Sequence, residues 1–105
     1  MTLHLTIITP DSKAFEAEGD SVVVPGSAGS FGVLPRHAPM LSAVGRGILK
    51  ATVDGEPTYF IVNEGVAEVG SNKVVVMVDQ VIAATDAQDA ADKLDELSLG
   101  SKLPE

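Results

Sequence analysis

The feature that most constrains this chain is a series of short apolar runs separated by turn-forming residues. Several runs are rich in β-branched residues, and residues 3–9 alternate Leu3, Leu5 and Ile7 with His4 and Thr6. Alternation with a period of two is typical of strands that bury one face. The runs span residues 3–9, 21–24, 31–34, 40–44, 48–53, 58–62, 66–69 and 74–78.

Two of the intervening segments carry strong hairpin chemistry. Asp54 and Gly55 tolerate positive φ and separate the runs at 48–53 and 58–62. The segment 70–73, Gly-Ser-Asn-Lys, separates the next two runs. Strands that recur every eight to twelve residues with turns between them are typical of an antiparallel sandwich or barrel. We therefore predict a mainly β fold.

After residue 84 the pattern changes to one that favours a helix. Thr85 or Asp86 can cap it, and Gln88 and Asp89 follow three residues later, as in a capping box. Alanines and leucines recur at helical spacing up to Gly100, a favourable C-terminal stop. We expect a β-sandwich domain over residues 1–84 and a short helical segment over 85–105.

Size and charge narrow the function classes. A chain of 105 residues fits one domain. Its net charge of −8 argues against nucleic-acid binding, which needs clustered lysine and arginine. The longest uninterrupted apolar run, residues 74–78, is far short of a membrane span. The N-terminus has neither a secretory-signal nor a transit-peptide pattern, so we expect membrane association only through a partner.

No motif supports catalysis, a cofactor or a metal. Glycines 26, 29 and 32 lack the Lys-Ser/Thr pair of a phosphate loop and the helix that follows a dinucleotide loop. Ser27 is not in the Gly-x-Ser-x-Gly arrangement of a hydrolase elbow. His4 and His37 have no histidine or cysteine partner at metal-ligand spacing, and the chain has no cysteine.

The stretch SFGVLPRHAPMLSA, residues 30–43, contains no catalytic motif, but its composition favours a rigid surface. Its glycine and two prolines fix the backbone, its apolar side chains offer contact area, and Arg36 and His37 lie at the tip. A rigid corner of this kind loses little entropy on binding, which suits protein recognition. The residues alone therefore indicate a β-sandwich interaction module with no named partner.

Three segments together resemble the epsilon subunit of the F-type proton-translocating ATP synthase, called delta in mitochondria. They are VVVPGSAGSFGVLPRHAPMLSAVGRGIL, YFIVNEGVAEVGSNKVVVMVD and the closing Ala/Asp/Leu-rich helix, in the same order as in the family. The resemblance implies an N-terminal sandwich of about ten strands followed by helix. It also implies a non-catalytic subunit of the rotating central stalk that couples rotation to the catalytic alpha/beta head and restrains ATP hydrolysis in many bacteria.

The resemblance further implies two contact surfaces. The gamma subunit would meet the surface that starts at His37 and includes Ala38, Pro39, Met40 and Ser42. The proteolipid ring would meet the loop around Ser30, here Gly29, Ser30 and Phe31. We expect a peripheral protein on the cytoplasmic face of a bacterial inner membrane, since a transit peptide is absent.

The chain departs from the family pattern at three places. Many relatives have an acidic residue where Ser30 stands, so we expect no salt bridge to the ring there. Asp89 replaces the arginine of the family's ATP-binding motif, and we expect weak or no ATP binding. Many bacterial relatives insert a second helix into the catalytic head, and this sequence has room for about one.

The alternative is a free-standing β-sandwich unrelated to ATP synthase, either an adaptor, a ligand-binding module or a small hydrolase. A carbohydrate binder stacks sugars on exposed aromatic rings, and this chain has no tryptophan and one tyrosine. Co-elution with a gamma subunit distinguishes the stalk subunit from this alternative.

Overall fold

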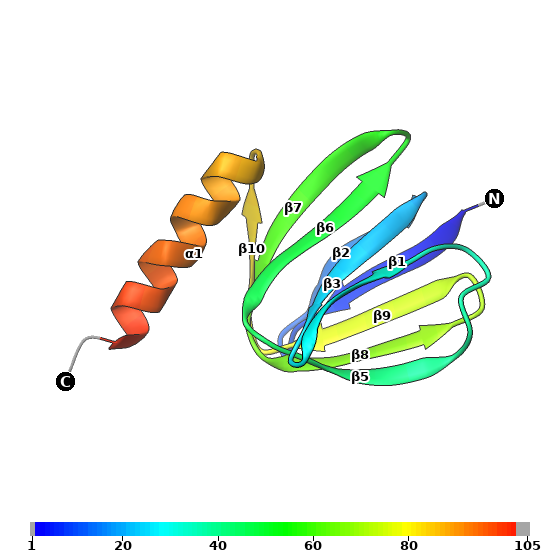
Figure 1. The fold of residues 1–105 in the computed structure, drawn as a ribbon, viewed down its shortest axis with the longest axis horizontal. Helices are drawn as coiled ribbons and strands as arrows, with labels where there is room; N and C mark the ends of the chain where they lie inside the picture. Colours follow the sequence, from blue (N-terminus) through cyan, green and yellow to red (C-terminus); the bar gives the residue numbers. More distant parts are fainter. Residues whose placement is uncertain (1, 103–105) are drawn as a thin grey trace.

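The computed structural model describes the backbone of residues 2–102 and the side chains of residues 2–95. It confirms the predicted fold class, ten strands in a sandwich followed by one helix (Figure 1). The elements are β1 (Leu3–Ile8), β2 (Lys13–Gly19), β3 (Ser21–Gly26), β4 (Gly29–Val33), β5 (Met40–Val44), β6 (Gly47–Val53), β7 (Glu56–Val62), β8 (Gly65–Gly70), β9 (Lys73–Val78), β10 (Val81–Ala84) and α1 (Ala87–Lys102).

The strands follow one hydrogen-bonded path that folds into two layers. The path runs β10-β7-β6-β3-β5-β8-β9-β1-β2, and β4 pairs with β3 beside it. β3 and β5 share a single residue pair, Gly26 with Val44, so the path bends there. We call β5-β8-β9-β1-β2 the first layer and β10-β7-β6-β3-β4 the second. Helix α1 lies beside β10 and β7, at one end of the molecule (Figure 1).

The sheet differs from the sequence-based expectation in the direction of one strand pair and in two additional strands. β1 pairs with β9 in parallel, whereas the pattern predicted antiparallel neighbours throughout. β2 and β10 were not among the eight runs read from the sequence. β2 nevertheless alternates in the strand manner, since Phe15 and Ala17 are half-buried while Glu16 and Glu18 are exposed. Because its alternate positions are charged, β2 does not form an apolar run in the sequence.

The core lies between the two layers and is built from alternate strand positions. In β9, Val74, Val76 and Val78 are buried while Met77 is exposed. The rings of Phe15 in the first layer and Phe60 in the second lie 4.8 Å apart, tilted by 54°. Most of the core consists of valine, leucine, isoleucine and alanine.

The helix begins as the capping pattern predicted. The Asp86 carboxylate accepts a hydrogen bond from the Asp89 amide at 2.8 Å. The Asp89 carboxylate accepts one from the Thr85 amide at 2.9 Å, and Lys93 lies 3.0 Å from it. These contacts hold the pKa of Asp89 below its usual range, chiefly through the Thr85 amide. Asp86 is thus the cap, and the backbone helix continues two residues past the expected stop at Gly100.

A close approach between β8 and β9 requires glycine at position 65. A β-carbon there would lie 1.9 Å from the Met77 carbonyl oxygen and 2.8 Å from the Val78 α-carbon. Both are backbone atoms of the central strand β9, so no side chain can move to relieve the overlap. The start of β8 and the end of β9 are consequently held tightly together.

We predict that Gly65→Ala lowers the free energy of unfolding by about 2–3 kcal/mol, because the two strands must separate to admit the methyl group. Urea unfolding followed by circular dichroism measures this change. Gly70→Ala at the other end of β8 is the control, since a β-carbon there meets nothing within 4 Å. An equal loss of stability in both variants would contradict the close-approach explanation.

A three-residue ionic cluster joins β1 and β2 on the outer side of the first layer. The two ring nitrogens of His4 contact Glu18 and Glu16, the latter at 2.5 Å. Glu18 and then Glu16 raise the pKa of His4. His4 lowers the pKa of Glu18, and Lys13, followed by His4, lowers that of Glu16. The pairing stabilises the fold most where the histidine is charged and both glutamates are ionised.

We predict that this contribution is greatest between about pH 4.5 and pH 6.5, the unfolded-state pKa values of glutamate and histidine. Because the pKa of His4 is raised in the folded protein, the contribution of the histidine to stability is lost as the pH rises from 6.5 through this raised pKa. The glutamate share is lost as the pH falls through their lowered pKa values. His4→Gln should flatten the pH dependence of the melting temperature above pH 6.5, and Glu18→Gln should do the same. An unchanged slope in both variants would refute the assignment.

Candidate functional site

The corner between β4 and β5 is a tight turn with an unusual residue at its tip. The His37 amide donates to the Leu34 carbonyl at 3.2 Å, and Arg36 has a φ of 70°. With Pro35 ahead of it, this geometry is that of a type II turn, whose third position favours glycine. Asn72 in the β8–β9 turn accepts a hydrogen bond from the Arg36 amide at 2.7 Å and holds the corner against the sheet.

The structure brings the five residues predicted to face gamma together along this corner and the start of β5. His37 is half-buried, and its Nδ1 lies 2.7 Å from the Ala38 carbonyl oxygen. Ala38 and Pro39 are exposed. Met40 and Ser42 lie opposite Val69 and Ala67 of β8, whose side chains are buried in the core.

Strand alternation therefore directs Met40 and Ser42 toward the core side of β5, and it directs Leu41 outward. Leu41 is 70% exposed, the largest exposed fraction among the large apolar side chains of the described residues. The candidate residues chosen from the sequence omitted Leu41. The signal that could have found it is the period-two pattern of β5 itself.

Leu41 belongs to an apolar surface on the outer side of the first layer. One cross-strand row pairs Ala43 with Val66, Val66 with Met77 and Met77 with Ile8. Val66 and Met77 are 38% and 41% exposed. We call this surface the outer apolar face; its members are Ile8, Leu41, Ala43, Val66, Val75 and Met77.

Charged side chains lie within the outer apolar face and beside it. Glu68 lies between Leu41 and Val75 in one cross-strand row, and Lys73 and the His4 cluster lie toward the end of the layer that carries the corner. Charged borders around an apolar centre are the usual anatomy of a protein interface. Exposed apolar side chains that gather on one face, with charges among and beside them, indicate a candidate site of interaction.

The residues predicted to face the ring lie at the other end of the sandwich. Gly26 pairs with Gly29 in the β3–β4 turn, and the Ser27 amide donates to the Ala43 carbonyl at 3.0 Å. Gly29 has a φ of 136°, which favours glycine, and Ser30 beside it is exposed. Phe31 is half-buried against the core and anchors the turn. The two predicted surfaces thus occupy opposite ends of β5.

The described residues contain neither a cluster of metal-ligating side chains nor a membrane-spanning helix. No group of three or more histidine, cysteine, aspartate or glutamate side chains in that part of the chain is arranged to hold a metal ion. No helix within it has the length and hydropathy needed to cross a bilayer.

Comparison with known proteins identifies the family. Residues 2–84 match the family model described as "ATP synthase, Delta/Epsilon chain, beta-sandwich domain". The ATP synthase epsilon chain of Synechococcus sp. (strain JA-2-3B'a(2-13)) is 37% identical over 100 residues, which cover 93% of this chain and 73% of that one. The epsilon chain of Nitratidesulfovibrio vulgaris (strain DP4) is 42% identical over 85 residues, covering 81% of this chain and 63% of that one.

A solved structure shares the fold. A chain in the structure of the Euglena gracilis mitochondrial ATP synthase, OSCP/F1/c-ring, has a TM-score of 0.74 at 20% identity and covers 99% of this chain and 68% of that one. The chain therefore spans about two thirds of the length of several relatives that it matches. The matched region includes every strand of the sandwich, and the chain belongs to the ATP synthase delta/epsilon family.

Proposed function

We propose that this chain is a non-catalytic rotor subunit of an F-type ATP synthase, located peripherally on the cytoplasmic face of a bacterial inner membrane. It binds the gamma subunit through the corner and the outer apolar face, and it binds the proteolipid ring through the β3–β4 turn. In this role it couples proton-driven rotation to ATP synthesis in the alpha/beta head. The observation that carries the proposal is the outer apolar face.

The outer apolar face is costly to leave in water. Leu41, Val66 and Met77 are each more than a third exposed, and they lie on three adjacent strands. Burial of apolar area contributes about 25 cal/mol per Å², so a chain that covers this face gains several kcal/mol. The rigid sheet beneath loses little entropy on binding. Both properties suit a permanent subunit contact.

The strained turn supports the corner as part of the same contact. A non-glycine residue in the left-handed region costs about 1–2 kcal/mol. Arg36 occupies that region although glycine would not be strained there. Strain of this kind is retained at binding sites where the side chain has a use. The guanidinium at the tip of the corner is a group that gamma can contact.

The helix supports the expectation of weak or no ATP binding. A phosphate needs a cationic partner, and position 89 provides a carboxylate that already accepts hydrogen bonds from Thr85 and Lys93. Lys93 also donates to the Ala83 carbonyl at 3.1 Å. Lys93 is thus committed to the fold.

We predict that the chain co-elutes with its gamma subunit in size-exclusion chromatography and that Leu41→Asp weakens the complex by at least about tenfold. The new carboxylate would be buried without a partner, which costs more than the 1.4 kcal/mol that corresponds to this factor. Titration by calorimetry measures the change.

Val23→Asp is the matched control, because Val23 is 36% exposed on β3 in the second layer, away from the outer apolar face. Equal weakening by both substitutions would indicate a general effect of charge or stability. Failure of the wild-type chain to bind any gamma subunit would favour the free-standing module.

We further predict that Arg36→Gly raises the free energy of unfolding by about 1 kcal/mol, because glycine removes the strain of the positive φ. Arg36→Ala keeps the strain and should leave stability nearly unchanged. Both variants lose the guanidinium, so both should weaken the complex with gamma to the same degree. Urea unfolding and calorimetry separate the two effects, and an unstabilised glycine variant would contradict the strain assignment.

A further inference from the structure

A hollow lies where β1, β8 and β9 meet, at the end of the sandwich away from the corner. Its volume is about 270 Å³, and it is lined by Ile8, Thr9, Pro10, Glu64, Gly65, Met77, Val78 and Asp79. The close approach at Gly65 makes the β9 backbone part of its wall. Ile8 and Met77 also belong to the outer apolar face, so the hollow is continuous with that surface.

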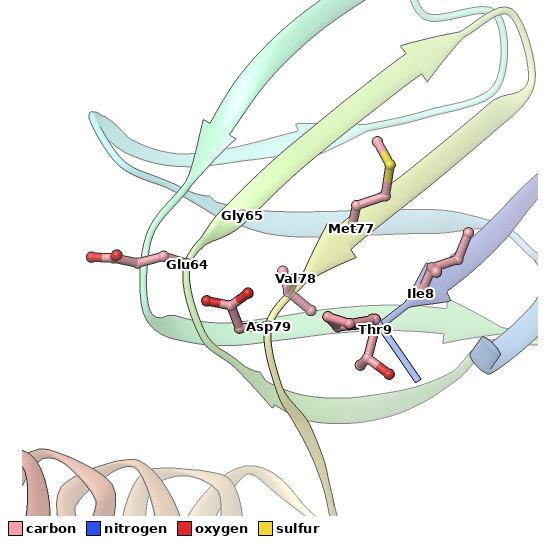
Figure 2. Close-up of a pocket in the computed structure, with 8 residues that line it drawn as sticks. Ile8, Thr9, Glu64, Gly65, Met77, Val78 and Asp79 are labelled. Atoms are coloured by element: carbon pink, nitrogen blue, oxygen red, sulfur yellow. The ribbon is translucent and has the colours of Figure 1, made fainter. Parts of the chain in front are cut away.

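The lining combines an apolar floor with two carboxylates. Figure 2 shows Asp79 on one side of the hollow and Ile8, Thr9 and Met77 on the other, while the Glu64 side chain extends outward from the edge, away from these residues. Both carboxylates are exposed, and within the described residues neither forms an ion pair. The Thr9 hydroxyl donates to the Ser12 carbonyl, which leaves its oxygen as a further acceptor. The negative charges and the Thr9 oxygen together favour a ligand that is cationic and donates hydrogen bonds.

The apolar part of the lining further restricts which kind of cationic group fits the hollow. A small inorganic cation would gain nothing from the apolar floor, and an entirely apolar group would bury the carboxylates without a partner. Lysine and arginine side chains have an apolar stem and a cationic head, which match the floor and the rim in turn. Arginine also presents several donors in a fixed plane, enough for two carboxylates.

We propose that this hollow receives an arginine or lysine side chain from the gamma segment that covers the outer apolar face. The proposal rests on the proposed function, because it is the covering chain that brings the basic side chain to the hollow. The stem lies against Ile8 and Met77, and the head lies at the Asp79 carboxylate, with Glu64 beyond it at the outer edge of the hollow. The contact fixes where the covering segment ends along the strands, since the hollow is at one end of the face.

The test compares binding of gamma to the wild-type chain and to the isosteric neutral variants Glu64→Gln and Asp79→Asn. We expect each to weaken the complex by about tenfold at low salt and by less at high salt, where screening reduces the charge term. Glu56→Gln is the matched control, because it removes the same exposed charge from β7 in the second layer. We expect it to bind gamma as the wild type does.

Two outcomes with a gamma-binding wild type would overturn the proposal and leave the proposed function standing. In the first, both hollow variants bind gamma with wild-type affinity. In the second, they retain gamma binding but bind the detergent-solubilised proteolipid ring less tightly, which would assign the hollow to the ring.

A second measurement decides the matter if the wild-type chain does not bind gamma, the result that would overturn the proposed function. The probe is n-butylguanidinium, and n-butylurea is its neutral isostere. We expect the methyl NMR signals of Ile8 and Met77 to shift saturably with the guanidinium only, and the effect to disappear in the Glu64→Gln/Asp79→Asn double variant. Equal responses to both compounds, or no response, would overturn the assignment of the hollow to a basic side chain.

Discussion

β9 carries more apolar surface than one core can bury. Val74, Val76 and Val78 fill the space between the two layers, and the alternate positions Val75 and Met77 stand on the outside. An uninterrupted valine-rich strand is typical of sheets that are covered on both faces. Here β9 is also the strand that joins the parallel β1 to the antiparallel β8, so it organises the whole first layer. The fold therefore presents an apolar surface as a direct consequence of its central strand.

Under the proposed function, that surface is what lets a small, acidic protein hold its partner. The net charge of −8 belongs to the chain as a whole, and a charge of this size keeps free copies apart and attracts basic surfaces. The apolar centre supplies the free energy of association once the surfaces meet. Cations near the outer side, such as Lys73, and the carboxylates Glu64 and Asp79 lie toward opposite ends of β8 and β9. The order of charges along the strands gives the partner one favourable direction.

The sequence predicted the parts of this architecture that depend on local chemistry. Asp54 and Gly55 have positive φ in the β6–β7 turn, and Asp86 caps the helix, as their residue types indicated. Pairing between distant segments was not predictable, because no local pattern distinguishes a parallel neighbour such as β9 from an antiparallel one. Of the candidate site, the corner was found through its prolines. Leu41 was missed because its importance depends on which side of β5 the second layer covers.

Near the two ends of β8, two positions favour glycine, but only the one in the close contact between strands has it. At Gly65 the close approach of β9 leaves no room for a side chain, and the sequence provides glycine. Beside the other end, the turn at Arg36 favours glycine equally, and the sequence provides arginine held by Asn72. Sequences that specify a fold agree with local preference except where another demand prevails. Packing does not explain an exposed arginine, and we propose that the demand at the corner comes from the partner chain that binds there.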